Sequence, residues 1–261
     1  MTLDWPIAVR ALNDASSLAW FGLALAPVYG GPSFVVAQRV AGGAALASLV
    51  VFAMLTMKGI VEPGGALGAS ELATMLGQTS FGHIWLTRAA LIIAALAFAS
   101  CTRVNIVLSG LQLALLGFAG HAFARGNVLG AIGEAVHLLA AGAWVGGALA
   151  LALLKGDVSA AAARFSKPGY AIASLTPVAG IAVLALTAGG VLPDLETDYG
   201  WLAGAKLALF LVLLALAGAN RFYALSRRNL SALRAGIAAE LLVMATLSLT
   251  AASLATTSPS M

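Results

Sequence analysis

Cysteine is almost absent from this sequence, whose 261 residues include a single one, Cys101. One cysteine excludes a disulfide framework within the chain and a metal cage built from several thiolates. Soft-metal chemistry in such a chain has to rely on methionine and histidine side chains.

Charged residues are also scarce: Asp, Glu, Lys and Arg make up 9% of the chain, whereas hydrophobic residues make up 61% and glycine occurs 29 times. A water-soluble domain could not cover this apolar content with polar surface, so the composition predicts a polytopic membrane protein. The formal net charge of +4 does not indicate nucleic-acid binding, because the basic residues lie in short links between apolar segments.

Catalytic and nucleotide-binding motifs are missing as well. The sequence has no P-loop, no dinucleotide fingerprint and no Ser/His/Asp order typical of hydrolases. Hydrolysis therefore has no candidate nucleophile, and we expect a transporter or metal-handling protein rather than an enzyme.

Long apolar runs dominate what is present. The first run is expected to remain as a helix, because Arg10, Asn13 and Asp14 interrupt the apolar region that a cleavable signal peptide needs. We predict an all-α membrane protein with eight transmembrane helices. The expected segments are Ile7–Tyr29, Phe34–Met57, Phe81–Ser100, Val104–Phe123, Leu129–Leu154, Tyr170–Leu192, Trp201–Tyr223 and Leu233–Thr256.

The distribution of basic residues predicts the orientation. The links that follow or adjoin the first, third, fifth and seventh segments contain Arg39, Arg103, Lys155, Arg164, Lys167, Arg227, Arg228 and Arg234. The opposite links contain only Lys58 and Arg125. Because cytoplasmic links are enriched in Lys and Arg, we expect a bacterial inner-membrane protein with both termini in the periplasm.

A weak internal repeat suggests two four-helix halves, 1–126 and 127–261, within a single transmembrane domain. AWFGLALA at 19–26 resembles AWVGGALA at 143–150, and TSFGHIWLTR at 79–88 resembles TDYGWLAGAK at 197–206. Repeats of this kind occur in membrane transporters. Chance similarity between apolar segments is the alternative.

The stretch 133–154 organises the chain. Glu134 and His137 are three residues apart and therefore share one helix face, although an ionisable group in the hydrocarbon layer is unfavourable unless it is paired, hydrated or bound. We interpret the pair as a metal ligand with a supporting carboxylate; a structural hydrogen bond between helices is the alternative. Gly142 and Gly146 on another face would let a neighbouring backbone approach closely.

Soft-metal ligands concentrate in the outer third of the predicted bundle. His83, His121 and His137 lie there, together with Met54 and Met57, which are three residues apart on one helix. Imidazole and thioether ligands at an oxidising surface point first to copper. Methionine is also ordinary core filler, so a packing role for either methionine stays open.

Two further charges, Asp14 and Arg88, are expected inside the membrane and could support the metal site. Asp14 could pair with Arg88 in the first half, as Glu134 could pair with Lys206 in the second. A proton or ion relay is the functional alternative to such structural pairs.

Soft ligands are few on the inner side, where Met244 and Cys101 lie, so the sequence does not trace a complete copper path. Glu240, in the inner third of the last segment, is expected to pair with Arg221 as part of the packing.

Several of these stretches together resemble the CopD family of copper-resistance inner-membrane proteins. The similar stretches are FGHIWLTR from 81, GHAFA from 120, HLLAAGAWVGG from 137, YGWLAGAK from 199, ANR from 219 and AELLVMATLSL from 239. The resemblance implies an eight-helix protein that moves copper across the cytoplasmic membrane with a periplasmic chaperone of the CopC type. Glu134 stands where the family pattern has Asp, and the first external link lacks a methionine-rich run.

Three functions remain in competition. The leading one is copper capture at the periplasmic face by His83, His121 and His137, with Met54 and Met57, followed by transport or delivery across the membrane. The second is haem-b electron transfer with His121 and His137 as axial ligands. The third is a scaffold that delivers copper without transporting it. The sequence predicts no oligomeric state.

Overall fold

The computed structural model describes residues 4–60, 68–120, 123, 126–188 and 195–257, and these form helices and turns without any strand. The long helices are α1 (Trp5–Leu25), α2 (Val35–Ile60), α4 (Ser80–Ala97), α5 (Thr102–Ala114), α7 (Val128–Leu153), α8 (Val158–Ala188), α9 (Asp198–Ala219) and α10 (Leu230–Thr256). Shorter elements are η1 (Ala26–Tyr29), α3 (Ala69–Gln78), η2 (Leu115–Ala119) and the π-helical η3 (Asn220–Leu225).

Side-chain caps define where several of these helices begin. Thr79, Asn127, Thr197 and Asn229 each precede a helix and accept a hydrogen bond from a backbone N–H in its first turn. Such caps satisfy N–H groups that have no partner inside the helix. The start of α7 is held further by Asn127, whose Nδ2 donates to the carbonyl of Leu186 in α8 (2.8 Å).

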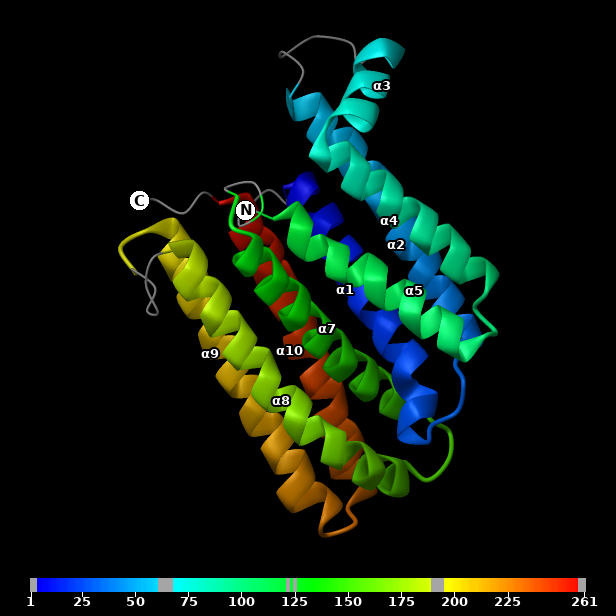
Figure 1. Cartoon of the computed structure of the whole chain (residues 1–261). Helices are drawn as coiled ribbons and strands as arrows, with labels where there is room; N and C mark the ends of the chain where they lie inside the picture. Colours follow the sequence, from blue (N-terminus) through cyan, green and yellow to red (C-terminus); the bar gives the residue numbers. More distant parts are fainter. Residues whose placement is uncertain (1–3, 61–67, 121–122, 124–125, 189–194, 258–261) are drawn as a thin grey trace.

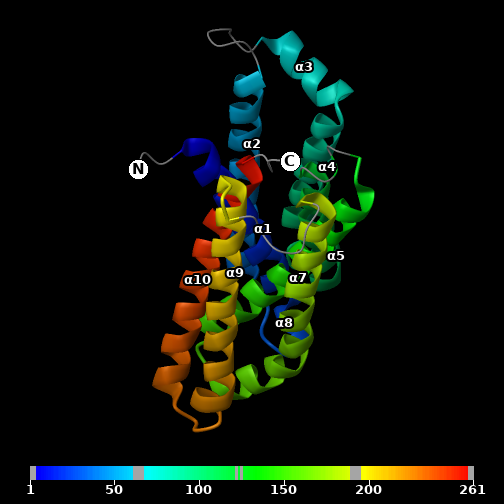
Figure 2. The ribbon, with the colours of Figure 1, turned by 90° about the vertical axis from the view of Figure 1, so that its left-hand side faces the viewer.

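The helices form a bundle with α1 and α7 in its middle (Figure 1). α1 packs most extensively against α2 and α7 and also contacts α5 and α10. Helices α2, α4 and α5 lie on one side of this central pair. Figure 2 shows α8 and α9 nearest the viewer, on the other side of the bundle.

The predicted all-α membrane fold is confirmed. Seven stretches of the described chain are long and apolar enough to span a bilayer, namely α2, α4, α5 with η2, α7, α8, α9 with η3, and α10. α1 is the eighth long helix: its 21 residues extend about 31 Å, the thickness of a hydrocarbon core. Its polar residues lower its hydropathy, and its central position buries them.

The structure corrects one detail of the sequence prediction and adds another. α8 begins at Val158 instead of near residue 170 and contains Pro168 and Pro177, because membrane helices tolerate proline where neighbouring groups satisfy the backbone. The external link between α2 and α4 contains a short helix, α3.

Both ends of the described chain lie at the same end of the bundle (Figure 1). Nη1 of Arg10 in α1 donates to the carbonyl of Ala255 near the end of α10 (3.5 Å). The charge distribution predicts this end to be the outer one, and it is called the outer end here. Helices α1, α4, α7 and α9 run from the outer end towards the inner end, and the other long helices run from the inner end towards the outer end.

Glycines bring the two central helices together. A Cβ at Gly22 of α1 would overlap the carbonyl oxygen of Gly142 and the backbone of Gly146, and a Cβ at Gly146 would overlap the backbone of Gly22. The predicted close approach at Gly142 and Gly146 is therefore confirmed, and α1 is the partner.

Candidate metal site

His137 is held in one orientation by α8. Its Nδ1 lies 2.8 Å from the carbonyl oxygen of Thr176. Since a carbonyl only accepts hydrogen bonds, Nδ1 carries the proton and donates it, which leaves the lone pair of Nε2 free. Gly180, one turn further along α8, makes room for the ring: a Cβ there would lie 3.3 Å from Cε1 and from Nδ1.

Charged side chains from four helices gather at the same depth as His137. Asp14, Arg88, His137 and Lys206 each lie nine or ten residues into a helix that starts at the outer end, which is about 12–14 Å along each helix. Glu134 lies one turn above His137. Lys206 and Glu134 act electrostatically on His137, and Arg10, Arg88, Glu134 and Lys206 act on Asp14. We call Asp14, Arg88, Glu134, His137 and Lys206 the outer polar cluster.

Arg88 is fully buried and bonds to neutral groups. Its Nη2 donates to side-chain oxygens at 3.0 to 3.4 Å, and its Nε donates to a backbone carbonyl at 3.2 Å; the acceptors are Asn13, Ser17 and Gln112. Asp14 forms its ion pair with Arg10, whose Nε lies 4.0 Å from Oδ2. The expected direct pair of Asp14 with Arg88 is therefore replaced by longer-range attraction.

The remaining candidate ligands have other surroundings. His83 is exposed at the start of α4, with Nε2 2.9 Å from the carbonyl oxygen of Gly77 in α3. Met54 is 53% exposed on α2, whereas Met57 is 2% exposed and packs in an apolar cluster of α1, α2 and α4. His121 lies outside the described residues. Within the described ranges, no group of three or more His, Cys, Asp or Glu is placed to share one ion.

Comparison with known proteins identifies the family. Residues 1–131 match the family described as Copper resistance protein D-like, N-terminal domain, and residues 159–254 match the family Copper resistance protein D. Over 254 residues the chain is 31% identical to Copper resistance protein D of Pseudomonas syringae pv. tomato, covering 83% of this chain and 81% of that protein. The chain belongs to the copper resistance protein D family.

A second relative agrees with the membrane location. The chain is 29% identical over 252 residues to Inner membrane protein YebZ of Escherichia coli (strain K12), covering 87% of this chain and 86% of that protein. No solved structure matches. With its spanning helices, this member of the copper resistance protein D family is a multi-pass inner-membrane protein with a role in copper resistance.

Within the outer polar cluster, His137 has the chemistry of a copper ligand. A neutral imidazole with a free Nε2 is a ligand that copper accepts, and a hydrogen bond to the other ring nitrogen orients such a ligand and increases its basicity. In this copper resistance protein a backbone carbonyl supplies that hydrogen bond, and it does so without adding a charge to the membrane interior.

A second buried polar group lies in the inner half of the copper resistance protein. Glu240 of α10 is 7% exposed and accepts a hydrogen bond from Nδ2 of Asn220 (2.6 Å), and the Trp144 side chain lies near enough to interact with it. Gly236 leaves the space that the Asn220 amide occupies. The expected partner of Glu240 was Arg221, and this prediction was wrong, because Asn220 faces α10 in its place.

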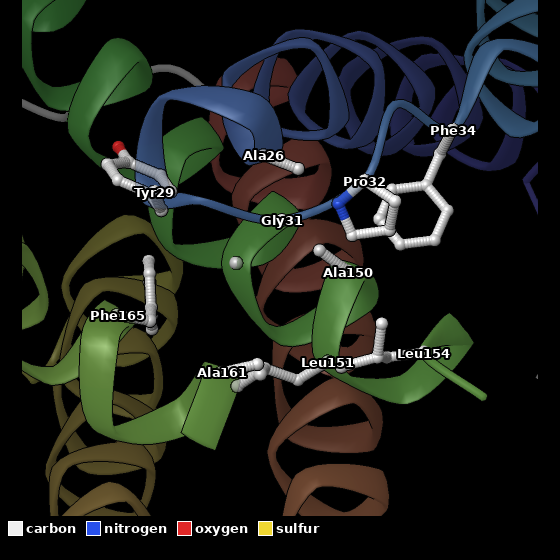
Figure 3. Close-up of a pocket in the computed structure, with 11 residues that line it drawn as sticks. Ala26, Tyr29, Gly31, Pro32, Phe34, Ala150, Leu151, Leu154, Ala161 and Phe165 are labelled. Atoms are coloured by element: carbon white, nitrogen blue, oxygen red, sulfur yellow. The ribbon is translucent and has the colours of Figure 1, made fainter. Parts of the chain in front are cut away.

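An apolar cavity near the inner end is too small for a cofactor. It measures about 30 Å³ and lies between the η1 region, the end of α7 and the start of α8 (Figure 3). Tyr29 and Phe165 close one side with their rings edge to face at 5.3 Å. A space of this size holds about one water molecule, so the candidate metal site remains at His137.

Proposed function

We propose that this copper resistance protein binds copper in the outer half of the bundle and transports or delivers it across the cytoplasmic membrane. The proposal is carried by the hydrogen bond from His137 Nδ1 to the Thr176 carbonyl, which leaves Nε2 as a ligand inside the membrane. The exposed His83 and Met54 would capture the ion at the surface, with His121 and Met57 as the further ligands that the sequence suggests.

The surrounding charges support a cation in this place. A cation enters the hydrocarbon region at a high cost unless negative groups or ligands receive it. Glu134 lies one helix turn from His137, and Asp14 lies within electrostatic range of Glu134. These two carboxylates offset the positive charges of Arg88 and Lys206, so that copper does not meet positive charge alone.

The partner and the orientation are part of the same proposal. Copper would arrive from the periplasm, where both termini lie, on a chaperone of the CopC type. α3 extends beyond the outer ends of α2 and α4 (Figure 1) and adjoins His83, so it would be the element that such a chaperone meets first.

The His137→Ala variant is expected to lose copper. We expect copper affinity to fall by more than about tenfold, because the other described histidine, His83, is exposed at the start of α4 and does not replace it. The measurement is the copper and haem content of the purified protein, with copper accumulation in cells. The Gly218→Ala variant on α9 is the control, since no atom lies within 4 Å of the added Cβ; it should keep the copper of the wild type.

Each competing function has a distinct result in the same experiment. A Soret band with bis-histidine features that disappears in His137→Ala would show that the protein binds haem b instead of copper. If His137→Ala binds as much copper as the wild type, His137 is not a copper ligand. Lost binding with unchanged cellular copper accumulation would indicate delivery without transport.

Gly180→Ala tests whether the orientation of His137 matters. A Cβ at position 180 would crowd the ring at 3.3 Å and push Nδ1 away from the Thr176 carbonyl. Loss of such a supporting hydrogen bond lowers metal affinity by roughly 10- to 100-fold, measured by competition with a chromophoric copper chelator. Gly218→Ala on α9, where no atom lies within 4 Å of the added Cβ, is the matched control. Equal affinity in both variants would contradict the positioning role.

A further inference from the structure

Trp144 links the outer polar cluster to the inner half of the bundle. It lies seven residues after His137 on α7, which places both on one face, about 10.5 Å apart along the axis. Trp144 is buried and belongs to one cluster with Met244 of α10 and Leu213 of α9. The ring of Phe210 contacts it edge to face at 6.0 Å.

Glu240 and Met244 share one face of α10 beside this indole. They are four residues apart, both are buried, and Met244 lies one turn closer to the outer end. Trp144 interacts with the Glu240 carboxyl group and belongs to the same packed cluster as Met244. Carboxylate, thioether and indole therefore lie in one neighbourhood of the bundle.

Glu240 carries no counter-charge in this place. Its polar neighbours, the hydrogen-bonded Asn220 and Trp144, are neutral, and among the residues that the structure describes it takes part in no ion pair. A buried carboxylate without a cation is strongly unfavourable in a membrane, so such groups mark ion or substrate paths. η3 begins at Asn220, and π-helical turns occur frequently at functional sites.

The side chains of Glu240, Met244 and Trp144 together favour one kind of ligand. Thioether sulfur prefers soft ions such as Cu(I), the face of an indole attracts cations, and one carboxylate would balance a single positive charge. We propose that Glu240, Met244 and Trp144, with Asn220 orienting the carboxylate, form an inner site for Cu(I). This inference rests on the proposed function, since it gives the ion bound at His137 its next position towards the cytoplasm.

The test is an anaerobic Cu(I) titration of the purified full-length protein against a chromophoric chelator. Met244→Leu conserves volume, and Glu240→Gln retains an acceptor for the Asn220 amide. Each variant is expected to bind one Cu(I) fewer per chain than the wild type, or to bind that ion at least about tenfold more weakly. Met75→Leu, a methionine of α3, is the matched control and should bind as the wild type does.

X-ray absorption gives a readout that a structural role would not change. The wild type loaded with Cu(I) should show more sulfur ligation per chain than Met244→Leu, which keeps any sulfur ligand that Met54 or Met57 supplies. Wild-type stoichiometry, affinity and sulfur signal in Met244→Leu would overturn the inner site, even if Glu240→Gln fails to fold. Loss of one ion in His137→Ala together with full binding in Met244→Leu would retain the proposed function without the inner site. The reverse pattern would retain the inner site and reject His137 as a ligand.

Discussion

The Gly146→Ala variant is expected to lose about 3 kcal/mol of folding free energy. Its Cβ would overlap the backbone of Gly22 in α1. Backbone atoms cannot move aside as a flexible side chain can, so the cost lies at the upper end for overpacking. α1 and α7 would separate, and with them the two sides of the bundle. The measurement is unfolding in mixed SDS and detergent micelles, with the yield of monodisperse protein.

Gly43→Ala provides the control for this substitution. Gly43 lies in the interior of α2, and an added Cβ there meets no atom within 4 Å. Alanine favours a helix over glycine by up to about 1 kcal/mol, so this variant should be as stable as the wild type or slightly more stable. Gly146→Ala unfolding at the same SDS fraction as Gly43→Ala would contradict the close crossing of α1 and α7.

The sequence predicted best the features that depend on a single helix. The stretch 133–154 was expected to span the membrane with one polar face and one smooth face, and α7 shows the smooth face at Gly142 and Gly146. Periodicity determines which residues share a face, because that depends only on the geometry of one helix. The membrane class followed in the same way from apolar length.

The sequence predicted less well the features that depend on two helices. A polar residue in an apolar segment signals that it needs a partner, but it does not say which helix supplies one. Asn13, Ser17 and Gln112 were such signals, and they proved to surround Arg88. The contact of His137 with α8 was equally hidden, since the acceptor is a backbone carbonyl that every residue has.

The inner site shows a second reason why contacts between helices were harder to predict from the sequence. Asn220 and Arg221 are neighbours, so a small change in helical phase decides which of them faces α10. The π-helical turn η3 starts at Asn220 and widens the helix there. A regular 3.6-residue period does not contain this change, and the sequence therefore favoured the ion pair of Glu240 with Arg221 over the observed hydrogen bond with Asn220.

Replacing Arg88 with methionine is expected to destabilise the protein by about 3–5 kcal/mol. The fully buried guanidinium donates to neutral acceptors of α1 and α5, and its replacement by methionine removes these hydrogen bonds inside the bundle. The stability of Arg88→Lys should lie between that of Arg88→Met and that of the wild type, because one ammonium group cannot reproduce the planar set of donors. Arg103→Met, at an exposed arginine of α5, is the control and should change stability by no more than about 0.5 kcal/mol.

A double-mutant cycle with Asp14→Asn separates the charge of Arg88 from its hydrogen bonds. Arg88 attracts Asp14 electrostatically without touching it, so Arg88→Met should leave the Asp14 carboxylate less fully compensated, with Arg10 as its ion-pair partner. The double variant should then be more stable than the sum of the single effects implies, by about 1 kcal/mol, in the same SDS unfolding measurement. That result would mean that the charge of Arg88 compensates the charge of Asp14, so that Glu134 is the carboxylate available to a cation bound at His137. Additive effects would contradict this balance and assign Asp14 to the cation as well.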